Sequence, residues 1–294
     1  GGSGPHPVAL MITGSGAQNR NEELLGHKPF LVMADYLTRH GIAVLRVDDR
    51  GVGGSTGDMS KATSADFVGD VLAGVEFLST QPDIDPRKIG LIGHSEGGLI
   101  APMVAARSER VAFVVLLAGT GVPGREVLRA QSELIDVAMG MTPEEAKVET
   151  ADQDAMLALV LSGADEATVL TKMREVGERQ LAAADASTDP KRREEAKTQR
   201  ATLDATIKQQ YKQLSSPWLV YFLTLDPRES LRKTHCPVLA LNGEKDLQVP
   251  PKQNLPEIEK ALKEAGNKDV TIKELPGLNH LFQHADKGIP DVVE

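Results

Sequence analysis

The sequence predicts an α/β fold in which a mostly parallel central sheet is flanked by helices and carries a large all-helical insertion. Short apolar runs alternate with helical patterns, which is typical of buried parallel strands joined by helices. One of these runs leads directly into a Gly-x-Ser-x-Gly sequence that a helical pattern follows at once. Farther along, the stretch from Pro123 to Leu231 has no convincing strand pattern and is rich in helix-forming residues.

The expected strands are short runs that are apolar throughout, as strands buried on both faces should be. They lie at 8–12, 42–47, 88–93, 111–117, 237–242 and 270–274. Apolar residues at helical spacing predict helices at 29–40, 64–78 and 255–264, and a further helix directly after the Gly-x-Ser-x-Gly sequence.

The strand-free stretch divides the chain. We expect residues 1–122 and 232–294 to form the core around the sheet, and residues 123–231 to form a helical cap, or lid. The last part of this segment contains the only tryptophan of the chain. Trp218, Tyr221 and Phe222 are therefore candidates for an aromatic wall over a substrate pocket, with packing between cap and core as the alternative.

Composition excludes several classes of protein. A formal net charge of −9 argues against nucleic acid binding, and the basic cluster Lys191–Arg193 is interleaved with acidic residues, as on a solvated helix. No apolar stretch approaches the roughly 20 residues that span a bilayer. The single cysteine, Cys236, is expected to be a small core residue. No Cys, His and Asp residues have metal-ligand spacing, so no metal site is expected.

The Gly-x-Ser-x-Gly sequence places Ser95 in the context of a nucleophile elbow, a strained turn between a strand and a helix. Gly93 and Gly97 have no Cβ, which permits close approach of strand and helix around this turn. The helix begins at Glu96, so its backbone N–H points toward an anion that forms above Ser95. His94 is expected to point away from the hydroxyl.

A serine hydroxyl needs a base to activate it and a third group to orient that base. Asp246 and His280 follow expected strands, so they should lie with Ser95 at the carboxyl edge of the sheet. The order Ser95, Asp246, His280 is that of an α/β-hydrolase triad, with nucleophile, acid and base in turn. Glu244 and Asp226 are the rival candidates for the acid.

A second oxyanion donor is expected from the Gly-rich loop after the first strand, at Ser15 or alternatively Gly16. A tight turn without a catalytic role is the competing interpretation. A dinucleotide-binding loop is excluded because Asn19 stands where the third glycine would be. The neighbouring Asp48-Asp49 pair precedes Arg50, which favours an Asp–Arg network that braces the loop over a metal site.

With these residues placed, the chain resembles the α/β-hydrolase superfamily, and most of all the bacterial serine esterases related to the prolyl-oligopeptidase and dipeptidyl-aminopeptidase branch. The matching stretches are ITGSGAQNR (12–20), HKPFL (27–31), DDRGVGGS (48–55), GLIGHSEGGLIAP (90–102), LNGEKDLQV (241–249) and LPGLNHLFQ (275–283). The resemblance implies hydrolysis of short-chain carboxylic esters through an acyl-enzyme, without a cofactor. It assigns the nucleophile to Ser95, the acid to Asp246 and the base to His280.

Relatives have strands before the one at Val8 and a closing helix after the histidine loop, so we expect both ends of this chain to be incomplete. The location is accordingly open between the bacterial cytoplasm and export of a soluble protein. A small-molecule ester is the expected partner, and a homodimer is left open. A serine aminopeptidase or dipeptidyl-peptidase-like hydrolase of small peptides is the nearest alternative, followed by a thioesterase and a ligand-binding relative without turnover.

Overall fold

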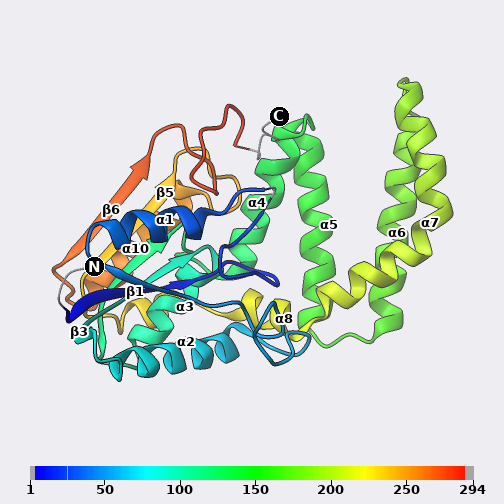
Figure 1. Cartoon of the computed structure of the whole chain (residues 1–294). Helices are drawn as coiled ribbons and strands as arrows, with labels where there is room; N and C mark the ends of the chain where they lie inside the picture. Colours follow the sequence, from blue (N-terminus) through cyan, green and yellow to red (C-terminus); the bar gives the residue numbers. More distant parts are fainter. Residues whose placement is uncertain (1–3, 25, 289–294) are drawn as a thin grey trace.

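Six parallel strands form one sheet in the order β2-β1-β3-β4-β5-β6 in the computed structural model, which describes residues 4–24 and 26–288 (Figure 1). The strands are β1 (His6–Ile12), β2 (Ala43–Arg46), β3 (Ile84–His94), β4 (Val111–Leu117), β5 (Val238–Gly243) and β6 (Val270–Leu275). All six predicted strands are present. β3 begins four residues earlier than predicted, because His6 also pairs with Ile84 beyond an irregularity in the β1–β3 register.

Helices connect these strands and also form most of the segment between β4 and β5. They are α1 (Pro29–Arg39), α2 (Ser64–Ser79), α3 (Glu96–Ala105), α4 (Gly124–Ala138), α5 (Pro143–Leu161), α6 (Glu166–Asp185), α7 (Pro190–Leu214), α8 (Pro217–Thr224), α9 (Arg228–Leu231) and α10 (Pro251–Glu264). None of the helices in the described ranges is both long and apolar enough to cross a bilayer.

The alternation of side chains along β1 explains how both faces of the sheet are covered. Val8, Leu10 and Ile12 join a core cluster that includes residues of α2, α3 and α10. Ala9 and Met11 point to the opposite face and join a smaller cluster with α1. The predicted burial of the sheet between two helical layers is therefore confirmed, and Cys236 packs half-buried against the larger cluster.

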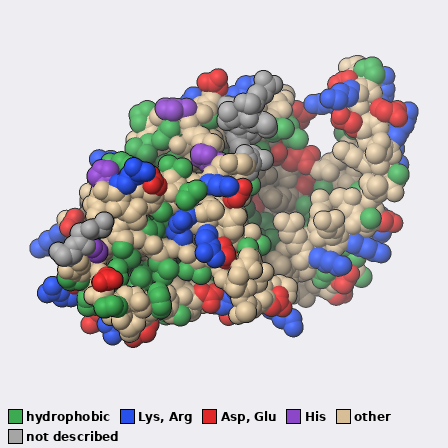
Figure 2. Space-filling view, viewed as in Figure 1, with side chains coloured by type: hydrophobic (Ala, Val, Ile, Leu, Met, Phe, Trp, Pro, Cys, Tyr) green, Lys and Arg blue, Asp and Glu red, His purple; other side chains and the backbone are tan. Residues whose placement is uncertain are grey.

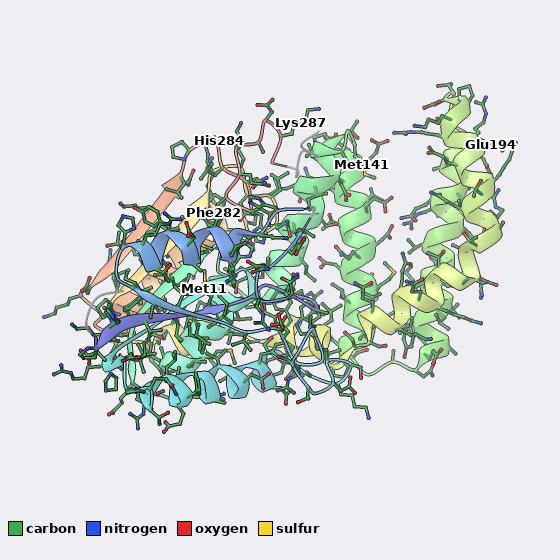
Figure 3. All side chains as sticks on the ribbon, viewed as in Figure 1. Met11, Met141, Glu194, Phe282, His284 and Lys287 are labelled. Atoms are coloured by element: carbon green, nitrogen blue, oxygen red, sulfur yellow. The ribbon has the colours of Figure 1, made fainter. Side chains whose placement is uncertain are left out.

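The helical segment, residues 123–231, contains α4 to α9 and no strand, as the sequence predicted. α5 begins with a capping box in which Thr142 accepts the N–H of Glu145 at 3.2 Å. The α6–α7 pair stands away from the sheet beyond α4 and α5 (Figure 1). Glu194, near the far end of this pair, lies well away from Met11 in the sheet (Figure 3).

The surface of the α6–α7 pair is crowded with side chains of both charges (Figure 2). Lys197 pairs with Glu194, and Arg174 with Asp204. The basic cluster at Lys191–Arg193 lies on this pair and is largely exposed, which agrees with a solvated helix.

The elbow glycines provide a test of how tightly β3, α3 and β1 approach one another. A Cβ on Gly97 would lie 2.1 Å from the backbone oxygen of Ile12, whereas a Cβ on Gly69, within α2, would meet nothing within 4 Å. Gly97→Ala should therefore lower the free energy of unfolding by about 1–3 kcal/mol. Gly69→Ala should raise it by roughly 0.5–1 kcal/mol. Urea denaturation of both variants measures this, and equal effects would contradict the close packing.

Candidate active site

Ser95 occupies a strained backbone position at the junction of β3 and α3. Its φ of 52° and ψ of −114° are unusual for a residue with a side chain. The turn is held by the Ser95 N–H, which donates to Leu117 O at 2.8 Å, and by Ser95 O, which accepts from the Gly98 N–H at 2.9 Å. A Cβ on Gly93 would lie 2.0 Å from Gly97 O, so glycine is required there. The local sequence therefore produces the elbow that it predicted.

Asp246 and His280 lie in contact, in the loops that follow β5 and β6. His280 Nδ1 is 2.8 Å from Asp246 Oδ2, and both side chains are buried. A Cβ on Gly243 would lie 2.2 Å from Leu278 O, which shows how closely the two loops pack. A carboxylate only accepts hydrogen bonds, so Nδ1 carries a proton and Nε2 is left for other partners.

The Asp246 carboxylate is fully satisfied by its own loop. Oδ1 accepts the N–H groups of Gln248 and Val249, each at 2.9 Å, and Oδ2 also accepts from Asn242 Nδ2 at 3.0 Å. These hydrogen bonds fix the position of the carboxylate. Asp246 can therefore hold the His280 ring in one orientation.

The rival acids have other partners. Glu244 Oε2 accepts the Gly277 N–H at 2.8 Å, and Asp226 makes a two-pronged ion pair with Arg228. Of the three sequence candidates, only Asp246 hydrogen-bonds to His280 within the described residues.

A cavity of about 260 Å³ brings the candidate residues together. Its lining includes Ser15, Ser95, Glu96, Trp218, Phe222 and His280. Trp218 and Phe222, one turn apart on α8, stack with ring centroids 5.6 Å apart. Tyr221 does not line this cavity, although all three aromatic residues belong to or pack against the main core cluster. Gly16 lines a neighbouring cavity of about 470 Å³ between α2 and the loops after β1 and β2.

The Glu96 side chain connects several elements behind Ser95. Its Oε1 accepts from Ser64 Oγ at 2.6 Å and from Trp218 Nε1 at 2.8 Å, and Ser15 also hydrogen-bonds to the carboxylate. Burial raises the pKa of Glu96, and these three hydrogen bonds oppose that rise. Through this carboxylate, α8 and the loop after β1 are both attached to the first residue of α3.

His94 also lines the cavity and contacts Glu22, a lining residue that the sequence analysis did not single out. His94 Nδ1 is 2.9 Å from Glu22 Oε1, and both residues are buried. Burial works to lower the pKa of His94, but the charge and hydrogen bond of Glu22, aided by His280 O and Asp246, raise it overall. The two residues are 72 positions apart in the chain, and no motif links them.

The loop after β2 contains the expected Asp–Arg pairing with a different arginine. Asp48 accepts from Arg20 Nε at 3.1 Å and from its second guanidinium nitrogen at 2.6 Å, while Arg50 pairs with Asp70 on α2. The hydrogen bonds from Arg20 hold the pKa of Asp48 far below its usual range. The expectation that the adjacent Arg50 would be the partner was wrong, because its side chain reaches across to α2.

Asp49 turns toward the loop after β1 and has a different environment. It accepts from Thr13 Oγ1 at 2.7 Å and from the Gln18 N–H at 2.9 Å. Burial raises its pKa to about 6 despite these bonds, and the nearby charges of Glu96 and Glu22 add to the rise. In the part of the chain that the structure describes, no group of His, Cys, Asp and Glu could hold a metal ion.

The fold and the position of these residues define an α/β-hydrolase, which confirms the expected superfamily. The family model described as serine aminopeptidase, S33, matches residues 29–286, a range that includes Ser95, Asp246 and His280. The chain belongs to this family of hydrolases.

Known relatives agree with this assignment. The esterase EstD of Thermotoga maritima is 30% identical over 130 residues, which cover 44% of this chain and 31% of the relative. This chain thus spans about a third of the length of that curated relative. The α/β-hydrolase GrgF of a Penicillium species matches with a TM-score of 0.53 and 18% identity, over 95% of this chain and 84% of its own. An esterase of Pyrococcus furiosus matches with a TM-score of 0.55 and 15% identity, over 94% and 75% respectively. At such identities, the two structures show a common fold.

The raised pKa of Asp49 predicts a characteristic pH dependence of stability. Its pKa is about 6 in the folded chain and about 3.9 when unfolded, so the folded state binds more protons between these values. The wild type should therefore gain about 1–2 kcal/mol relative to Asp49→Asn as pH falls from 7 to 4, after allowance for solvent screening of this partly exposed carboxyl. Urea denaturation at both pH values measures this gain. Asp35→Asn, on the exposed face of α1, controls for the loss of one carboxylate, and a pH-independent difference for Asp49→Asn would refute the expectation.

Proposed function

We propose that the protein hydrolyses short-chain carboxylic esters through an acyl-enzyme formed on Ser95. The observation that carries this proposal is the elbow: Ser95 lines the same cavity as His280, whose ring is oriented by the buried Asp246. Similarity to esterases of the same fold supports the reaction class.

In the first half of the proposed reaction, Ser95 Oγ attacks the carbonyl carbon of the ester. His280 Nε2 takes the hydroxyl proton as the new C–O bond forms, and Asp246 stabilises the resulting imidazolium. Collapse of the tetrahedral intermediate breaks the bond to the alcohol oxygen. That oxygen receives the proton from His280, and the alcohol leaves.

In the second half, water attacks the acyl-serine and His280 accepts one of its protons. The bond to Ser95 Oγ then breaks, and Oγ takes the proton back as the carboxylic acid departs. The net reaction consumes one ester and one water, and it requires no cofactor.

The negative charge on the intermediate requires backbone donors. Glu96 is the first residue of α3, and N–H groups in the first turn of a helix have no acceptor within it. The N–H of Gly14 is not free to bind the oxyanion, because it donates to Glu22 Oε1 at 2.6 Å. Of the two remaining choices, Ser15 lines the cavity of Ser95 while Gly16 lines the neighbouring one. We therefore assign the oxyanion hole to the N–H groups of Glu96 and Ser15.

We further propose that the helical segment, residues 123–231, acts as a cap. Residues of α4 and α8 line the cavity, among them Val127, Leu128, Trp218 and Phe222. Among the described residues that line the cavity there is no Lys or Arg, whereas Glu22 and Glu96 are present. Such a wall is suited to neutral acyl groups and offers no partner for the phosphates of an acyl-coenzyme A, which disfavours a thioesterase.

A peptidase is the second candidate, since the matching family model is described as a serine aminopeptidase. The same nucleophile and base would serve, but the amine leaving group would need protonation by His280 before it could depart. A substrate comparison separates the two functions.

Ser95→Ala should abolish hydrolysis of p-nitrophenyl acetate and butyrate, with a loss of at least about 10⁴-fold in kcat, because the nucleophile is removed. The measurement compares p-nitrophenyl esters from acetate to decanoate with an aminoacyl p-nitroanilide. Ser108→Ala, in the loop between α3 and β4, is the matched control and should leave turnover unchanged. Faster serine-dependent release from the anilide than from any ester would favour the peptidase, and ester hydrolysis that survives in Ser95→Ala would disprove the mechanism.

Trp218→Ala should enlarge the cavity and shift the preference toward longer acyl chains. Because one methylene in an apolar pocket is worth about 1–3 kcal/mol, the ratio of kcat/KM for octanoate to that for acetate should rise roughly 10-fold or more. Tyr221→Phe changes a residue of the same helix that does not line the cavity and is the control. An unchanged ratio in Trp218→Ala would show that α8 does not form the acyl pocket.

A further inference from the structure

Glu22 and His94 form a polar bridge behind the candidate nucleophile. His94 Nδ1 lies 2.9 Å from Glu22 Oε1, and His94 Nε2 lies 2.9 Å from the backbone oxygen of His280. The same Glu22 oxygen accepts the N–H of Gly14 at 2.6 Å. The bridge therefore joins the loop after β1, the end of β3 and the loop after β6.

The hydrogen bonds determine where the protons lie. A backbone carbonyl only accepts, so Nε2 of His94 must carry a proton toward His280 O. Glu22 Oε1 accepts from Gly14, and the charge and hydrogen bond of Glu22 raise the pKa of His94 against the effect of burial, which places a second proton on His94 Nδ1. Glu22 and His94 thus form a buried carboxylate–imidazolium pair with no net charge.

Stability alone does not account for this arrangement. Glu22 is 5% exposed and His94 6% exposed, and a buried ion pair seldom stabilises a protein more than apolar residues of similar size would. Glu22 also adopts a φ of 52°, and its Oε2 has no hydrogen-bond partner among the described residues. Strained backbone and unsatisfied polar atoms of this kind are concentrated at functional sites.

The bridge contacts the residues whose relative positions the reaction requires. A Cβ on Gly14 would lie 3.2 Å from Ser95 Cβ and 3.5 Å from His94 Nδ1, so this loop packs directly against the elbow. With the Gly14 N–H held by Glu22, the next N–H of the loop is the one left to face the oxyanion. On the other side, His94 holds the backbone of the residue that supplies the base.

We propose that Glu22 and His94 are positioning residues that fix the oxyanion loop and the His280 backbone relative to Ser95. This inference rests on the proposed function. Neither residue is assigned a contact with the reacting atoms. Both act through Gly14 and His280, whose placement must be accurate because an error of about 1 Å can cost roughly 100-fold in rate.

The bridge also sets the electrostatic environment of the base. The rings of His94 and His280 have centroids 4.8 Å apart, and Phe282, labelled in Figure 3, packs edge-on against His94 at 6.2 Å. The charged groups that act on His94 are Glu22 from the loop after β1 and Asp246 from the loop after β5. The two rings lie side by side, so a change of charge at His94 changes the electrostatic field at the base.

Glu22→Gln tests the proposal. In the wild type, the Gly14 N–H and His94 Nδ1 both contact Glu22 Oε1. The side-chain amide that Glu22→Gln introduces would carry no charge, so it would stabilise the proton on His94 Nδ1 less than the carboxylate does. We expect kcat per folded molecule to fall about 10–100-fold with KM changed by less than about 3-fold. Glu23→Gln is the matched control, since this neighbouring exposed glutamate undergoes the same chemical change. It should retain wild-type kcat.

Two further readouts separate positioning from simple destabilisation. Loss of the imidazolium beside His280 should move the acidic limb of the kcat/KM profile to higher pH in Glu22→Gln, but not in Glu23→Gln. In the wild type, ¹⁵N NMR of the imidazole should find both ring nitrogens of His94 protonated at pH 7. The NMR measurement needs no variant, so it decides the state of the bridge even if Glu22→Gln does not fold.

Wild-type kcat and an unshifted pH profile in folded Glu22→Gln would overturn the positioning role while leaving the esterase proposal intact. A wild-type His94 that titrates freely near its ordinary pKa of about 6.5 would also overturn it. Absence of Ser95-dependent turnover in the wild type would instead refute the proposed function, and the positioning role with it.

Discussion

The left-handed backbone of Ser95 is the constraint on which the rest of the site depends. Such a conformation costs roughly 1–3 kcal/mol for a residue with a side chain, and surrounding structure must hold it in place. Here β4 supplies a backbone acceptor at Leu117, and glycines at 93 and 97 allow β1, β3 and α3 to approach within backbone contact. Because α3 starts at the next residue, the same turn presents the Ser95 hydroxyl and the Glu96 N–H at one end of the sheet.

Three buried carboxylates lie around this turn, and each accepts hydrogen bonds from a different set of donors. Asp246 accepts from two backbone N–H groups, an asparagine and His280. Glu96 accepts from hydroxyl groups and an indole, and Glu22 accepts from Gly14 and His94. The uncharged donors around Glu96 leave its pKa raised, while His94 provides Glu22 with a charged partner. Of the three, all within the described residues, Asp246 alone touches the His280 ring, so it is the carboxylate placed to stabilise the imidazolium that the proposed proton transfer from Ser95 would produce.

The sequence predicted the sheet and the elbow well because both depend on local patterns. Apolar runs determined the strands, and the glycines flanking Ser95 marked the turn. Asp246 and His280 could be placed at the same edge as Ser95 because strand ends in a parallel sheet converge there.

Contacts between distant loops could not be predicted in the same way. Glu22 reaches His94 across 72 residues, and Arg20 takes the place expected for Arg50 across 28. In both cases the partner lies in the irregular loop after β1, whose path no periodic pattern determines. Helix phase shows that Trp218 and Phe222 share a face of α8, but not which face meets the cavity, so Tyr221 was included with them.

The helical segment divides into a part near the cavity and a part remote from it. α8 is tied to Glu96 through Trp218, and α4 contributes Val127 and Leu128 to the cavity wall. The α6–α7 pair contributes no residue to that wall, and its apolar cluster around Val169, Met173 and Ile207 packs against α5. Changes on α6 and α7 therefore act on residues remote from the cavity wall, whereas a change at Trp218 acts on the pocket and on the Glu96 carboxylate together. If the segment is a cap, selection among acyl groups resides in α4 and α8, the two helices of the segment that line the cavity.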